Sequence, residues 1–126
     1  MVLPALAQGR YAYSRTKLVG SRLGVSKHYI DTYAEDPQGR IHLVSLKWQQ
    51  VGGTAEQKIP FEVISLIDLL LKNEHYYKAH LVLGGNGWKY KDFYVGGGLN
   101  TFIRNADRVN ITTLETFVGA ANQGRL

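Results

Sequence analysis

The sequence predicts a single α/β domain in which helices flank a mixed sheet. First, segments rich in β-branched and aromatic residues alternate with helix-like segments, in the order strand, strand, helix, strand, helix, strand, helix. Second, 44% of the 126 residues are hydrophobic, which is enough for one core, and no repeat or linker divides the chain. We therefore treat residues 1–126 as one domain.

The first 24 residues give an ambiguous pattern. Residues 3–8 are compatible with a short helix, and the stretch 11–19 with an extended segment that Gly20 and Gly24 interrupt. The sequence therefore leaves the structure of this part of the chain open.

Residues 27–48 predict two strands joined by a turn. Residues 27–34 are rich in β-forming side chains, and Pro37 with Gly39 marks the turn. Residues 40–48 form the partner strand, and their apolar content predicts burial on both faces of the sheet.

A helix follows the break at residues 51–53. Either a first turn over 55–59 leads into a kink, or the helix proper begins at Pro60, because proline is tolerated only in the first turn. Asn73 ends it. The pattern predicts a wide apolar face made of Phe61, Ile64, Leu66, Ile67, Leu70 and Leu71.

The remaining elements are shorter. A buried strand is predicted over 79–83, a short helix over 99–106, a last strand over 109–112 and a closing helix over 114–121. Together with the earlier segments they complete the predicted sheet and its flanking helices.

Composition excludes several kinds of site. Without cysteine there are no disulfides and no thiolate metal ligands, and no apolar run approaches the roughly 18 residues of a membrane span. The first residues lack the basic lead of a signal peptide. We expect a soluble cytoplasmic protein without a membrane partner. No metal-ligand spacing is formed by His28, His42, His75 and His80.

Positive charge is concentrated near the N-terminus. The net charge is +5, and an excess of Lys and Arg favours a polyanionic partner because neutralised phosphates release counterions. The acid-free first 27 residues also contain Tyr11 and Tyr13, which predict a phosphate- or base-contacting surface; the alternative is a solvated basic arm. The cations of this segment are Arg10, Arg15, Lys17, Arg22 and Lys27.

An acid and a lysine flank the turn between the first two predicted strands. Asp31 precedes the turn, and Ser45 and Lys47 follow it on one face of the next strand, because side chains repeat every two residues. Brought together, the acid and the lysine could hold a divalent metal beside a phosphate. The structural alternative is an Asp31–Lys47 ion pair.

Asp31, the triplet Ser45-Leu46-Lys47 and a helix beginning near Thr54 resemble the PD-(D/E)XK nuclease superfamily, which includes many restriction endonucleases and Holliday-junction resolvases. The resemblance covers residues 28–84. It implies a restriction-endonuclease-like αβββαβ core with a mixed central sheet flanked by helices. It also implies DNA as the partner and Mg²⁺ as the cofactor, with Mn²⁺ able to substitute.

Each residue of the motif then has a chemical role. Mg²⁺ prefers hard oxygen ligands, so Asp31 would bind it directly and the Leu46 backbone carbonyl could supply a second oxygen. Lys47 would favour hydroxide at the metal-bound water and stabilise the developing oxyanion charge.

Ser45 departs from the pattern, which places Glu or Asp there. The second carboxylate could come from the following helix, and we favour Glu62 over Glu56 because Glu56 falls in an exposed first turn. Alternatively the hydroxyl suffices, with Gln49 or Gln50 fixing a water. In a third explanation the site is inactive and only binds nucleic acid. Both glutamates could also simply complement the helix dipole.

Other residues are assigned to the edge of the site. Gln50 could hold the attacking water, and Trp48 is expected to be a core anchor rather than a base-stacking platform. The aromatic and basic segment 88–94 could face DNA or simply pack. Further nucleic-acid-contacting cations are Lys58, Lys89 and Lys91.

The sequence therefore predicts a small Mg²⁺-dependent endonuclease of the restriction, homing or junction-resolving type. Cutting two strands needs two sites, so we expect a homodimer. The alternatives are an inactive nuclease-fold module that binds nucleic acid or another subunit, and an unrelated α/β domain with a basic surface.

Overall fold

The computed structural model describes the backbone of residues 1–126 and every side chain except that of Thr54. The order of elements α1-β1-β2-β3-α2-β4 confirms the predicted αβββαβ core, and β5 and α4 extend it. The helices are α1 (Val2–Gln8), α2 (Lys58–Lys72), α3 (Lys91–Val95) and α4 (Leu114–Asn122). The strands are β1 (Ala12–Arg22), β2 (Ser26–Glu35), β3 (Ile41–Trp48), β4 (Tyr76–Gly84) and β5 (Val109–Thr113).

The five strands form one mixed sheet in the order β1-β2-β3-β4-β5. The pairs β1–β2 and β2–β3 are antiparallel, and β3–β4 and β4–β5 are parallel. Pairing between β2 and β3 ends where Thr32 lies opposite Val44, whereas β3 remains paired with β4 as far as Trp48 opposite Gly84. The strands β2 and β3 therefore separate along the second half of β3.

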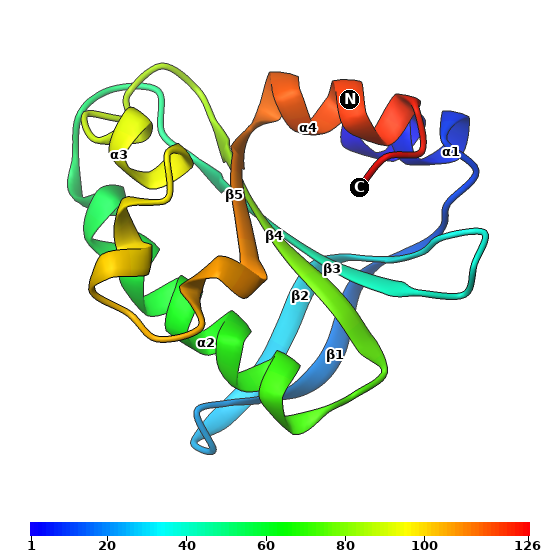
Figure 1. Ribbon diagram of the computed structural model, residues 1–126. Coiled ribbons are helices and arrows are strands. Elements are labelled where there is room, and N and C mark those ends of the chain that lie inside the picture. Colours follow the sequence, from blue (N-terminus) through cyan, green and yellow to red (C-terminus); the bar gives the residue numbers. More distant parts are fainter.

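Helices cover both faces of the sheet (Figure 1). One core lies under α2 and α3 and includes Leu43 and Leu66, whereas the other lies under α1 and α4 and includes Val44 and Phe117. Adjacent residues of β3 thus enter different cores, as the alternation of side chains along a strand requires. This confirms the prediction that β3 is buried on both faces.

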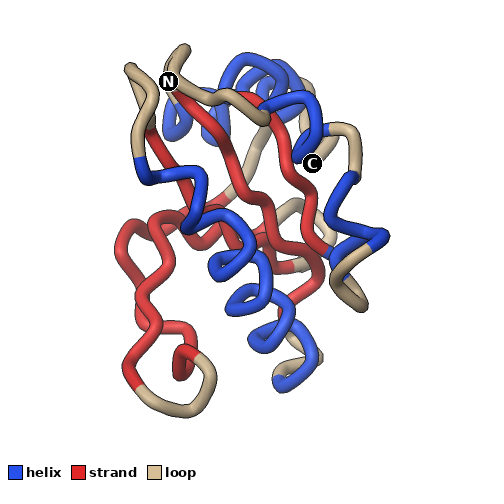
Figure 2. Tube along the Cα trace, turned by 90° about the vertical axis from the view of Figure 1, so that its left-hand side faces the viewer, coloured by secondary structure: helices blue, strands red, loops and turns tan.

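The strands β1 and β2 form a long hairpin that projects beyond the rest of the sheet (Figure 2). Its turn contains Leu23 and Gly24, which both have positive φ, at 53° and 78°. The predicted interruption at Gly20 is instead a bulge within a continuous strand, because the β1–β2 register shifts between Leu18 and Gly20.

Helix α2 follows a 3₁₀ turn over Thr54–Gln57, so Pro60 lies in its first turn, where the missing N–H is harmless. Its buried stripe runs from Ile59 through Val63 and Leu66. Phe61, Ile64 and Leu71 are exposed, so the predicted apolar face was wrong at these positions. Apolar residues surround the helix, and periodicity alone did not fix which of them face the sheet.

Two further predictions of secondary structure differ from the structure. Residues 99–106 form no α-helix; the segment contains only the 3₁₀ turns Gly98–Thr101 and Ala106–Arg108. Residues 91–94 of the aromatic and basic segment 88–94 belong to α3 (Lys91–Val95), a helix that the sequence did not predict. None of the helices in the described chain is long and apolar enough to span a membrane.

A buried chain of hydrogen bonds, which we call the histidine chain, lies on the α4 face of the sheet. His42 Nε2 lies 3.0 Å from Asp36 Oδ2, and His42 Nδ1 lies 3.0 Å from His80 Nε2. His80 Nδ1 in turn lies 3.1 Å from Asn110 Nδ2. Both imidazoles are fully buried and stack with ring centroids 5.2 Å apart. Every ring nitrogen of this chain therefore has a partner.

Candidate functional site

The site is built on the second half of β3, where every second side chain points to the α2 face of the sheet. Ser45 and Lys47 share that face with Leu43 of the core under α2. Glu62 stands on the buried side of α2 and is 3% exposed. The helix acid and the two strand residues therefore meet between α2 and the sheet.

Glu62 is surrounded by donors, and we call this group the Glu62 cluster. Its Oε1 accepts a hydrogen bond of 2.8 Å from Arg22 Nη1, and its Oε2 accepts one of 2.9 Å from Ser45 Oγ. Lys47 Nζ lies 3.3 Å from Oε2, and His28 Nε2 lies 3.9 Å from Oε1. A single carboxylate thus pairs with two permanent cations, Arg22 of β1 and Lys47 of β3.

The ionisation of Glu62 is set by these neighbours. Burial alone raises the pKa of a carboxyl group, but the hydrogen bond from Arg22 and the charges of Lys47 and Arg22 more than offset it. The Ser45 hydrogen bond acts in the same direction. The pKa of Glu62 therefore lies below its usual value, and the group is a carboxylate at neutral pH.

His28 completes the cluster from β2. Its side chain is buried, and Nδ1 has no hydrogen-bond partner among the described residues. Burial lowers the pKa of His28, and the charge of Arg22 lowers it further. A neutral imidazole with a free nitrogen therefore faces the carboxylate. Sequence reasoning did not identify His28; its only signal was a polar residue alternating with Ile30 on a buried strand face.

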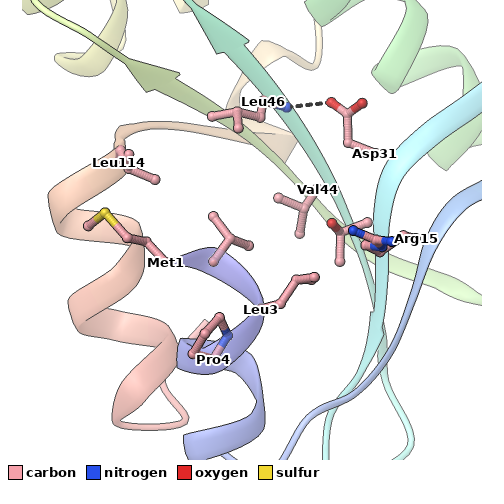
Figure 3. Close-up of a pocket in the computed structure, with 10 residues that line it drawn as sticks. Met1, Leu3, Pro4, Arg15, Asp31, Val44, Leu46 and Leu114 are labelled. Atoms are coloured by element: carbon pink, nitrogen blue, oxygen red, sulfur yellow. Dashed lines mark hydrogen bonds between the residues drawn. The ribbon is translucent and has the colours of Figure 1, made fainter.

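Asp31 lies at the separation between β2 and β3. Its Oδ2 accepts a hydrogen bond of 2.7 Å from the Leu46 backbone N–H, which has lost its strand partner there. Figure 3 shows this bond beside an apolar cavity of about 540 Å³ on the α1 and α4 side. Arg15 and Val44 also line the cavity. Asp31 thus places an exposed carboxylate at the edge of a recess.

Asp31 and Lys47 do not form a direct ion pair among the described side chains, since Lys47 pairs with Glu62 instead. The two charges nevertheless belong to one electrostatic environment. Asp31, Lys47 and Glu62 all act on the pKa of His28. The structure therefore replaces the Asp31–Lys47 ion pair of the sequence-based alternative with a Lys47–Glu62 ion pair.

Of the two candidate helix acids, Glu62 reaches Ser45 and Glu56 does not. Glu56 Oε1 accepts a hydrogen bond from the Tyr90 backbone N–H and so faces the loop after β4. Gln49 is also occupied: its amide donates to the Gly87 carbonyl at 2.7 Å and accepts from Ala55 N at 3.1 Å. Gln49 therefore joins two loops and is not free to hold a water.

Two aromatic predictions were wrong. Trp48 is 59% exposed and is not a core anchor; its ring lies against Gly84, where a Cβ atom would come within 2.4 Å of it. Conversely, Tyr11 is buried, donates its N–H to the Leu6 carbonyl and accepts a hydrogen bond at its hydroxyl from Leu126 N, so it cannot contact a phosphate. Gln50 is exposed beside Trp48 and remains a prediction.

The predicted nucleic-acid-contacting cations lie largely at the surface. Arg22 is the exception, since it is partly buried against Glu62. Lys17 Nζ lies 3.9 Å from the ring centroid of Tyr33, which holds it along β2. The exposed members are Arg10, Arg15, Lys17, Lys27, Lys58, Lys89 and Lys91.

No group of three or more His, Asp or Glu side chains in the described part of the chain is arranged to hold a metal ion. Mg²⁺ does not require such a cage, because it commonly uses one or two carboxylates and keeps several waters. The donor chemistry of Asp31, Glu62 and the Leu46 carbonyl suits it. The unpaired Nδ1 of His28 is a further polar atom without a partner in this environment.

Comparison with known protein families gives a match that covers nearly the whole chain. A family described as PD-(D/E)XK nuclease superfamily domain matches residues 4–124. Comparisons with curated proteins and with solved structures give no match. The matched region extends well beyond residues 28–84, where the sequence motif lies, and includes most of α1 together with β5 and α4.

Proposed function

The chain belongs to the PD-(D/E)XK nuclease superfamily, and we propose that it is a Mg²⁺-dependent endonuclease that hydrolyses DNA phosphodiester bonds. One observation carries this proposal: the buried Glu62 carboxylate lies beside Ser45 and Lys47. A helix residue thus supplies the acid that the strand triplet lacks. The superfamily implies nucleic acid as the partner; DNA cleavage of the restriction, homing or junction-resolving type is the proposed reaction.

Asp31, the Leu46 carbonyl and Glu62 are the proposed oxygen donors for the metal. When bound, Mg²⁺ lowers the pKa of a coordinated water and offsets phosphate charge. Lys47 stabilises the negative charge that develops on the phosphate oxygens. In the hydrolysis, the water oxygen forms a bond to phosphorus, one bridging P–O bond breaks, and the leaving oxygen takes up a proton. Gln50, exposed after β3, is proposed to orient the water.

Nucleic-acid binding is proposed to rest on the exposed cations of the β1–β2 hairpin and on Lys58, Lys89 and Lys91. Electrostatic attraction of this kind is independent of sequence and depends on salt. Two strands require two cuts, so we propose a homodimer with one site per subunit.

A second candidate function has an observation in its favour. Ser45 cannot replace a carboxylate charge, and Arg22 and Lys47 already neutralise Glu62. A catalytically inactive module that binds nucleic acid or a partner subunit would tolerate this arrangement. The two functions differ in their dependence on metal.

Plasmid cleavage in Mg²⁺ tests the leading proposal. We expect nicking or linearisation by the wild-type chain and its loss in Asp31→Ala, Lys47→Ala and Glu62→Gln. Asp68→Asn and Lys72→Ala are matched controls, because they form an ion pair on the same helix away from the cluster. Cleavage that persists in Glu62→Gln would remove the proposed role of the helix acid. DNA binding without cleavage or metal uptake would favour the inactive module.

A further inference from the structure

The donors around Glu62 leave little room for a cation. Arg22 occupies Oε1 at 2.8 Å, and Ser45 with Lys47 occupies Oε2 at 2.9 and 3.3 Å. A carboxylate offers about four lone-pair positions, and two positive charges at this range repel a divalent ion. Direct metal binding to Glu62 therefore requires at least one cation to leave.

Among these partners Arg22 is the one best placed to leave. Ser45 and His28 are buried. Lys47 is 34% exposed, but its backbone is held by pairing with β4, and its ammonium group is the proposed partner of the reacting phosphate. Arg22 instead ends the edge strand β1, directly before the hairpin turn at Leu23. Its side chain is 26% exposed. It can therefore reach solvent with little change in the core.

A surface position is available to the Arg22 side chain. Its guanidinium lies 5.8 Å from the ring centroid of Phe61, which is 51% exposed on the first turns of α2. Guanidinium groups stack on aromatic faces and bind phosphate through several N–H donors at once. The same hairpin carries the exposed cation Lys27. A phosphate drawn to the hairpin thus offers Arg22 a new anionic partner.

We propose that Arg22 makes nucleic-acid binding and metal binding interdependent: it holds Glu62 in the free protein and transfers to a backbone phosphate of the nucleic acid, which frees Glu62 for the metal. The proposal rests on the proposed metal role of Glu62. By linkage, each ligand must then tighten the binding of the other by the same factor. The free protein is a weak metal binder, so a divalent ion is fully engaged only where nucleic acid is present.

Mn²⁺ binding measured by electron paramagnetic resonance, without nucleic acid, tests the proposal independently of activity. We expect Arg22→Gln to bind Mn²⁺ about 10-fold more tightly than the wild type, because the competing cation is gone. Lys27→Gln is the matched control: it removes one positive charge from the same hairpin without a contact to Glu62. It should change Mn²⁺ affinity less than about 2-fold.

The same titration with a non-cleavable duplex measures the coupling. In the wild type the duplex should tighten Mn²⁺ binding, and in Arg22→Gln most of this gain should be lost because Glu62 is already free. Equal effects of Arg22→Gln and Lys27→Gln would overturn the proposal, as would weaker Mn²⁺ binding by Arg22→Gln with an unchanged melting curve. Arg22→Lys keeps the positive charge but loses the planar guanidinium. The gain in Mn²⁺ affinity on adding the duplex should therefore lie between those of the wild type and Arg22→Gln.

Glu62→Gln distinguishes a failure of the metal role of Glu62 from a failure of the role of Arg22. If it leaves Mn²⁺ affinity unchanged in both the wild-type and Arg22→Gln backgrounds, the metal role of Glu62 fails and the present proposal fails with it. If Glu62→Gln weakens Mn²⁺ binding but Arg22→Gln does not tighten it, only the role of Arg22 fails.

Discussion

The molecule contains two buried polar networks on opposite faces of one sheet, and they are built in opposite ways. The histidine chain of Asp36, His42, His80 and Asn110 pairs every ring nitrogen. The Glu62 cluster leaves His28 Nδ1 without a partner among the described residues and contains more positive charge than negative.

Packing separates the two networks further. The His42 ring contacts Tyr11 and Tyr77 edge-on at centroid distances of 5.8 and 5.4 Å, and the His80 ring contacts Phe117 at 5.6 Å. Rings enclosed in this way cannot exchange partners without opening the core. In the Glu62 cluster, the Arg22 and Lys47 side chains are 26% and 34% exposed on long flexible stems.

The difference separates a network suited to a structural role from one suited to the functional role that we propose. A buried network in which every polar atom is hydrogen-bonded fixes the register of the strands. It has no unpaired donor or acceptor left for a ligand. An incompletely satisfied cluster with partly exposed cations is better suited to take up a metal or a phosphate. Polar burial alone is therefore a poor sign of function, whereas polar burial with an unpaired atom and exchangeable partners is a better one.

The largest expected effect is on catalysis. Glu62→Gln should reduce the rate of DNA cleavage about 10³-fold, roughly 4 kcal/mol in the activation barrier, because an oxygen ligand loses its charge. Its cost in stability should be only about 1 kcal/mol, since Arg22 and Lys47 can return to solvent. Cleavage assays and urea unfolding on the same preparation check both. A large stability loss would contradict the description of the cluster as exchangeable.

The opposite pattern is expected in the histidine chain. His80→Ala should destabilise the fold by about 3 kcal/mol, because it leaves His42 Nδ1 unpaired and opens a cavity next to Phe117. Cleavage at low temperature, where the variant is still folded, should remain within about 2-fold of the wild type. Urea unfolding with a parallel cleavage assay measures this. Loss of activity in a folded His80→Ala would mean that the networks are coupled across the sheet.

Sequence reasoning grouped Ser45, Lys47 and Glu62 but missed the rest of the Glu62 cluster and all of the histidine chain, for a physical reason. The period of two along a strand places Ser45 and Lys47 on one face, and Glu62 is the favoured acid because the resemblance expects an acid that the following helix can supply. His42 and His80 meet only because β3 and β4 are neighbours in the sheet, a long-range fact that spacing does not encode. Without a recognisable ligand spacing, the histidines gave no signal.

The same limit explains the residues that were missed or misplaced in the site. Arg22 was predicted as a surface cation, and its pairing with Glu62 depends on how the hairpin packs over α2. Trp48 was expected in the core because tryptophan usually is, but β2 has separated from β3 at that point and leaves it exposed. The environments of Arg22 and Trp48 thus depend on how distant segments pack together, which residue type alone does not reveal.

Acid should destabilise the protein mainly through the histidine chain. Burial lowers the pKa of His42 and, more strongly, of His80, with Arg40 and Lys78 adding positive charge nearby. The pKa of Asp36 falls to about 2; burial raises it, but hydrogen bonds from His42 and Arg40 lower it more. All three groups are depressed in the folded state, so each contributes stability above its unfolded pKa that is lost as pH falls.

The pH range over which stability is lost follows from the directions of these pKa shifts. Stability should be constant above about pH 7, decline below about pH 6.5 as the unfolded histidines take up protons, and fall by about a further 2 kcal/mol below pH 4 as Asp36 is protonated. Urea unfolding at a series of pH values measures the slope. In His80→Ala the slope between pH 6.5 and 5 should be smaller. An unchanged slope would assign the acid sensitivity to other groups, such as His28 in the Glu62 cluster.

The smallest effect concerns single surface charges beside each network. Lys27 lies on the hairpin near the Glu62 cluster, whereas Lys78 lies near His80. If only the first region contacts DNA, Lys27→Gln should reduce the slope of log affinity against log salt by about 0.9, the value for one phosphate, and Lys78→Gln should leave it unchanged. Fluorescence anisotropy with a short duplex at several salt concentrations, without Mg²⁺, measures both slopes. Equal slope changes would place nucleic acid over both networks, and the histidine chain would then lie beneath a binding surface rather than apart from it.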